Sequence, residues 1–128
     1  MFSEKFSPLI NAFPQEADAI RRVAEHFGAI ELRDGIRVLE VEMNPGRLFD
    51  VSQAGSSARF AKVTTILIQA GILERKYVIR SPLGPAIMEV ESWYDCPLSV
   101  YDPLRDITME VSDSDLETMY SVVKDGTH

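Results

Sequence analysis

Residues 56–80, SSARFAKVTTILIQAGILERKYVIR, constrain the fold of this chain more than any other stretch. Either Ser56 or Ser57 can cap a helix by accepting a hydrogen bond from a backbone N–H. The apolar residues that follow share one helical face: Phe60, Val63, Ile66, Leu67 and Ala70. Gly71 ends this helix, and the next residues, ILERKYVIRS, are rich in strand formers. The stretch predicts a helix with Leu67 buried, an abrupt stop and a strand.

The charge of the chain is unevenly distributed. The net charge is −7, which argues against indiscriminate binding to nucleic acid. Residues 1–56 carry −3 and residues 81–128 carry −8, whereas residues 57–80, which we call the basic island, carry +4. The acidic region 81–128 has three readings: a solubilising surface, an edge that repels non-specific DNA, or a patch for a basic protein partner. The positive charge therefore falls on the helix and strand described above.

The length of 128 residues predicts one globular domain. No apolar run approaches the roughly 20 residues that span a bilayer, so we expect no membrane segment. The segment MFSEKFSPLI lacks the regions of a signal peptide, and the single cysteine, Cys96, excludes an internal disulfide bond. We therefore expect a cytoplasmic protein.

The N-terminal half predicts a helix, a hairpin and a second helix. Residues 14–27 have an apolar stripe at helical spacing, with Pro14 at the first position and Gly28 as the stop. Asp34-Gly35 is a two-residue turn typical of a β-hairpin, and residues 36–43 form its second strand. Asn44-Pro45-Gly46 interrupts this strand, and residues 47–54 form a short helix that Gly55 ends.

The C-terminal half predicts a second hairpin and a terminal helix. Residues 72–81 and 86–94 form two strands joined by a turn at 81–85. Prolines and aspartates exclude a long regular element from residues 93–106. Residues 113–124 form an amphipathic helix, with Ser114 and Glu117 as its capping box. We expect a domain at 1–110 and a helix at 111–128 that serves as a dimerisation element.

A short helix, a turn, a longer helix ending in Leu-x-x-x-Gly and a two-stranded hairpin resemble a winged helix-turn-helix. The residues that carry the resemblance run from Leu67 to Arg75, LIQAGILER, and are similar to those of MarR-like and PadR-like transcriptional regulators. The resemblance covers residues 14–92. One departure is the Asp34-Gly35 hairpin, because the family's strand between its first and second helices is usually short. The expected fold class is α+β, a winged helix with an extra β-hairpin and a C-terminal amphipathic helix.

The resemblance implies sequence-specific binding of double-stranded DNA by a transcriptional regulator. It places a recognition helix at residues 57–70 in the major groove and a wing at residues 72–92 on the DNA backbone or in the minor groove. The basic island supports phosphate contacts. The outward side of the helix holds Ala58, Ala61, Lys62, Thr65, Ile68 and Gln69. The expected DNA-binding residues are Ser56, Ser57, Arg59, Lys62, Thr65, Gln69, Arg75, Lys76 and Arg80.

The alternative function is a winged-helix adaptor that binds protein instead of DNA. Ile68 on the outward side of the helix suits a protein contact or a local core position. Trp93, Tyr94 and Tyr101 suit a partner-binding segment, although aromatic residues here can equally form a lid over the core. The DNA-binding regulator, by contrast, is expected to be a homodimer whose seam is the terminal stripe of Leu116, Met119, Tyr120 and Val123.

No constellation of residues indicates an enzyme. Two histidines and one cysteine have no spacing that suits a metal cluster, and no phosphate-binding loop or dinucleotide signature is present. We therefore expect no cofactor and no metal.

Overall fold

The computed structural model has a mixed α+β fold and divides into two compact units. It describes residues 2–123, apart from the side chains of Ser3 and Trp93. Unit 1 comprises residues 1–74 and 120–128, and unit 2 comprises residues 75–119. Among the described residues, no helix has both the length and the apolar character needed to cross a membrane.

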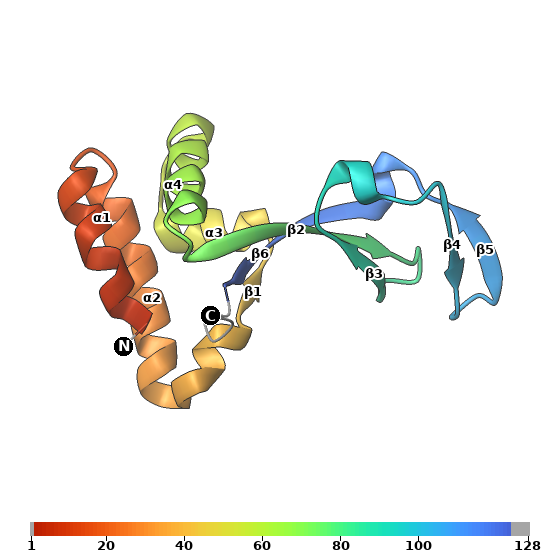
Figure 1. Ribbon diagram of the computed structural model, residues 1–128, viewed down its shortest axis with the longest axis horizontal. Coiled ribbons are helices and arrows are strands. Elements are labelled where there is room, and N and C mark those ends of the chain that lie inside the picture. Colours follow the sequence, from red (N-terminus) through yellow and green to blue (C-terminus); the bar gives the residue numbers. More distant parts are fainter. Residues whose placement is uncertain (1, 124–128) are drawn as a thin grey trace. The chain divides into compact units, whose positions relative to one another are not determined.

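Unit 1 contains the four α-helices of the described chain: α1 (Ser7–Ala12), α2 (Ala17–Asp34), α3 (Pro45–Ser52) and α4 (Ser57–Gln69). Short 3-10 helices precede α1 (η1, Phe2–Phe6) and follow α2 (η2, Gly35–Glu40). Strand β1 (Glu42–Met43) lies between η2 and α3 along the chain. Figure 1 shows α1 lying along α2.

Helix α2 is longer than expected, and the extra β-hairpin is absent. Gly28 does not end the helix, because Ala29, Glu31, Leu32 and Arg33 are good helix formers that continue it to Asp34. Gly35 then adopts a φ of 62° and ends the helix. A positive φ suits both a helix stop and a hairpin turn, so Asp34-Gly35 did not distinguish them. The prediction of strands around this dipeptide is therefore wrong.

The segment predicted as a C-terminal amphipathic helix is a strand. A 3-10 turn (η4, Asp113–Asp115) leads into β6 (Leu116–Val122), and the capping box consists of Ser112 and Asp115 in place of Ser114 and Glu117. Met43 of β1 pairs with Tyr120 of β6. Pairing with a strand distant in sequence thus overrides the local helical spacing. Within residues 111–123 there is no terminal helix, and residues 124–128 lie outside the described structure.

The larger sheet has the strand order β1–β6–β2–β3 and includes β2 (Leu73–Arg80) and β3 (Ala86–Val90). Strand β2, the turn and the start of β3 agree with the sequence prediction, but β3 ends at Val90 and not at residue 94. A second sheet pairs β4 (Ser99–Asp102) with β5 (Ile107–Glu110), and a 3-10 turn (η3, Trp93–Asp95) precedes it. Elements within residues 93–106 are short, as expected, but the β4–β5 hairpin was not predicted.

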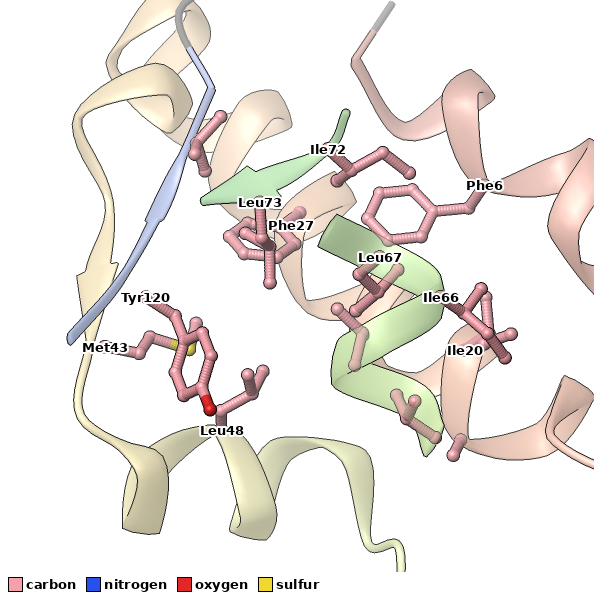
Figure 2. Close-up of a cluster of buried hydrophobic side chains, with 14 of the residues drawn as sticks. Phe6, Ile20, Phe27, Met43, Leu48, Ile66, Leu67, Ile72, Leu73 and Tyr120 are labelled. Carbon is pink, nitrogen blue, oxygen red and sulfur yellow. The ribbon is translucent and has the colours of Figure 1, made fainter. Parts of the chain in front are cut away.

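The main core lies in unit 1. Figure 2 shows Leu67 of α4 among apolar side chains from α2, α3 and the neighbouring strand residues. Leu67 and Leu48 are fully buried, and Tyr120 is 6% exposed. The prediction that Leu67 is buried is confirmed. Arg22 of α2 donates to the carbonyl of Ser52 at 3.3 Å, which links α2 to the C-terminal end of α3.

Asp102 is a buried charge that joins three segments of unit 2. Its carboxylate accepts hydrogen bonds from Ser81 Oγ at 2.7 Å, from Arg105 Nε at 2.7 Å and from the backbone N–H of Leu104 at 2.9 Å. Burial disfavours the charged form of Asp102 and raises its pKa, but these hydrogen bonds outweigh burial, so the net pKa is lowered. The charged carboxylate therefore stabilises the packing of β4 against the end of β2.

We expect acid to destabilise unit 2 through Asp102. A carboxyl group with a depressed pKa stabilises the fold at pH values above its unfolded pKa of about 3.9. This stabilisation is lost as the pH falls through the depressed pKa, because protonation removes the charged acceptor. Amide NMR signals of β4 and β5 should stay dispersed down to about pH 4 and collapse below it. Asp102→Asn should weaken these signals at neutral pH, whereas equal acid resistance of the two proteins would contradict this role.

Candidate nucleic-acid interface

Helix α4 is positioned by a cap at its N-terminus and a glycine just after its C-terminus. The Ser56 side chain accepts a hydrogen bond from the backbone N–H of Arg59 at 3.2 Å, which satisfies one free donor of the first turn. Gly71 has a φ of 75°, which allows the chain to leave the helix and enter β2. The predicted bounds of this helix are confirmed to within one residue.

One side of α4 is buried and the opposite side is exposed. Val63, Thr64 and Leu67 are buried against the core of unit 1. The exposed residues follow helical spacing on the other side: Ala58, Ala61, Lys62, Thr65 and Gln69. We call these five residues the outward face. The structure thus brings Lys62, Thr65 and Gln69 together on one exposed surface, as the sequence predicted.

Ile68 does not belong to the outward face. It is half-buried and packs against the core cluster of unit 1. This position agrees with the local-core alternative for Ile68.

The N-terminal end of α4 adds a second cation and two hydroxyl groups. Ser56, Ser57 and Arg59 are all exposed. The Arg59 guanidinium donates from Nη1 to the carbonyl of Gln15, in the turn between α1 and α2. A guanidinium has five N–H donors, so this bond leaves others for a ligand.

The exposed surface of α4 carries no opposing charge of its own. The chain has no Asp or Glu from Val51 to Leu73, although it holds 20 acidic residues in total. Arg59 and Lys62 are the charged residues within this stretch. The charges that α4 itself contributes are therefore both positive, in an otherwise acidic protein.

Arg47 was missed by the sequence analysis. It is exposed in the first turn of α3, and its backbone N–H donates to the side chain of Asn44, the N-cap, at 2.8 Å. An exposed cation on the helix that precedes α4 is chemically suited to a phosphate contact. Asn44 followed by Pro45 is a signal for the start of a helix, and it places Arg47 in the first turn of α3. The sequence prediction instead took these residues as the end of a strand.

A pocket of about 420 Å³ borders α3, and the residues that line it carry both positive and negative charges. Its charged lining combines Arg22 and Arg47 with Glu25 and Asp50. Burial, Arg47 and Arg33 lower the pKa of His26 in this pocket, which favours the neutral imidazole. His26 lies in the middle of α2.

The cations of the predicted wing lie in unit 2, where Lys76 and Arg80 engage carboxylates. Lys76 Nζ lies 3.1 Å from Glu89 Oε1, and the Lys76 side chain is only 16% exposed. Arg80 Nε lies 2.6 Å from Glu117 Oε2, and its Nη1 donates to the carbonyl of Gly84. Arg75 is exposed. A phosphate would have to compete with these carboxylates for Lys76 and Arg80.

The residues expected to bind a protein partner are distributed over both units. In unit 2, Tyr94 is 98% exposed and Tyr101 is 52% exposed, so neither side chain forms a lid over a core. The Tyr101 hydroxyl donates to Asp106, and this bond raises the pKa of Tyr101, which keeps the hydroxyl protonated. The side chain of Trp93 lies outside the described structure.

The proposed dimer seam of helical residues does not form. Tyr120 is buried in the core of unit 1, while Leu116, Met119 and Val123 are half-buried. Since Leu116, Met119 and Tyr120 belong to strand β6, the helical stripe on which the seam was based is absent.

No protein-family model, curated protein or solved structure matches this chain.

Proposed function

We propose that the protein binds double-stranded DNA sequence-specifically as a cytoplasmic transcriptional regulator, with the outward face of α4 in the major groove. The observation that carries the proposal is the exposed surface of α4. It presents Arg59, Lys62, Thr65 and Gln69 without any carboxylate on the helix. A helix of this diameter fits the major groove, where side chains can reach base edges.

The order of elements along the chain supports the proposal. Helices α2, α3 and α4 are followed by the β2–β3 hairpin, which is the order that a winged helix requires. Strand β1 is two residues long. The extra hairpin expected at Asp34-Gly35, which departed from the family's pattern, is therefore absent. The turn between α3 and α4 is short and contains Gln53 and Gly55, both with positive φ.

The charged, amide and methyl-bearing residues exposed on α4 suit different parts of a DNA duplex. Lys62 and Arg59 supply positive charge for phosphates or for guanine edges. Gln69 can bond an adenine edge through both of its amide atoms, and the methyl groups of Ala58, Ala61 and Thr65 suit contacts with thymine methyl groups. Arg47 would contact a phosphate from the first turn of α3.

The proposal is tested by titrating labelled duplex DNA with the full chain over a range of salt concentrations. Binding should weaken steeply as salt rises, because each phosphate contact releases counterions and adds about 0.9 to the log–log slope. A mixture of genomic fragments should contain some that bind more tightly than the rest. Absence of binding at low salt would overturn the proposal.

A further inference from the structure

The β4–β5 hairpin, residues 98–111, exposes large apolar side chains. Leu98 is 90% exposed, Tyr101 and Leu104 are each 52% exposed, and Ile107 is 46% exposed. Exposed apolar residues gathered on one small element are typical of a binding surface for another protein.

The two faces of this hairpin differ in chemistry. Cross-strand pairs join Val100 to Met109 and Asp102 to Ile107, so the apolar side chains of β5 lie on one face. The pairs Tyr101–Thr108 and Ser99–Glu110 form the other face, and all four of these residues are exposed. Along β5, apolar Ile107 and Met109 therefore alternate with polar Thr108 and acidic Glu110.

Strand β5 has an open edge. The sheet consists of two strands, and within residues 2–123 no third strand pairs with either of them. Figure 1 shows β5 at the end of its sheet. Pro97 and Pro103 flank β4 and lack the N–H groups that an added strand requires, whereas β5 contains no proline. An edge of this kind is a template for an incoming strand.

The net charge of unit 2 indicates which kind of incoming strand would bind to β5. Unit 2 contains nine carboxylates and four cations, giving −5. Ion pairs within the unit engage Lys76 with Glu89, Arg80 with Glu117, and Arg105 with Asp102. The carboxylates of Asp106 and Glu110 are exposed on the hairpin itself. The surface therefore attracts a basic partner.

We propose that β5 binds an extended segment of another protein in which Lys or Arg alternates with apolar residues. The segment adds to the hairpin as a third strand, held by backbone hydrogen bonds along β5. Its apolar side chains lie beside Ile107 on one face, and its cations lie beside Glu110 on the other. This interaction is independent of DNA binding by α4.

The test uses a labelled synthetic peptide of alternating lysine and valine, titrated with the full chain. The peptide should bind, and amides of β5 should gain protection from hydrogen exchange. A second peptide has the same sequence with alternate backbone nitrogens methylated on the edge that would pair with β5. It should not bind, because it cannot complete the strand pairing. A third peptide, with glutamate in place of lysine, should not bind either.

Protein variants locate the site. Glu110→Lys and Ile107→Ser should each weaken binding by roughly tenfold. The matched variants Glu40→Lys and Leu32→Ser alter exposed residues of unit 1 and should leave affinity unchanged. No peptide binding, or equal binding of the methylated peptide, would overturn strand addition. Light scattering that shows a dimer of the unmodified protein, lost in Ile107→Ser, would assign the edge to a second copy and also overturn the proposal.

Discussion

Replacing Leu67 by alanine is expected to lower the free energy of unfolding of unit 1 by about 2–5 kcal/mol. Leu67 has no exposed surface, and its side chain packs in the cluster that joins α2, α3 and α4. Alanine removes apolar contacts and leaves a cavity that neighbouring side chains fill only in part. Because unit 1 holds every α-helix of the described residues, the helical circular-dichroism signal during urea unfolding reports on it.

A matched control lies two residues away. Gln69→Ala changes an exposed position on the same helix and should alter the free energy by less than about 0.5 kcal/mol. Equal effects of the two substitutions would mean that the orientation of α4 about its axis is wrong, and that the outward face is misassigned.

The substitution Lys62→Glu is expected to weaken DNA binding by roughly tenfold or more. Loss of one good contact costs about 1–3 kcal/mol, and the new carboxylate also repels phosphates. The salt dependence should flatten by about one unit. Arg37→Glu is the control, because Arg37 is exposed on η2, away from α4 in sequence, and its substitution changes the net charge equally. If both variants bound DNA alike, net charge alone would explain the effect, and α4 would lose its assigned role.

The sequence predicted α4 and β2 closely because local signals agree there. Ser56 caps the helix, the apolar residues keep helical spacing, and Gly71 supplies the stop before a run of strand formers. Exposure of Lys62, Thr65 and Gln69 followed directly from that spacing. When propensity, pattern and capping indicate the same element, tertiary packing has little to override.

Elsewhere the local signals were ambiguous, and distant partners decided the structure. Residues 116–122 have apolar spacing that suits a helix, but pairing of Tyr120 with Met43 makes them a strand. The ion pair of Arg80 with Glu117 likewise joins residues far apart in sequence, so the sequence could not indicate that this wing cation is already engaged. The sequence likewise did not indicate the open edge of β5. Whether a strand lies at the edge of a sheet depends on which strands pair with it.

The most direct measurement is an amide NMR spectrum of the full chain with and without a mixed-sequence DNA duplex. Binding through α4 predicts shifts concentrated at Ala58, Ala61, Lys62, Thr65 and Gln69, with the β4–β5 hairpin unchanged. Shifts that weaken as salt is added would identify the electrostatic part of the contact. Shifts confined to unit 2, or an unchanged spectrum at low salt, would contradict DNA recognition by the outward face of α4.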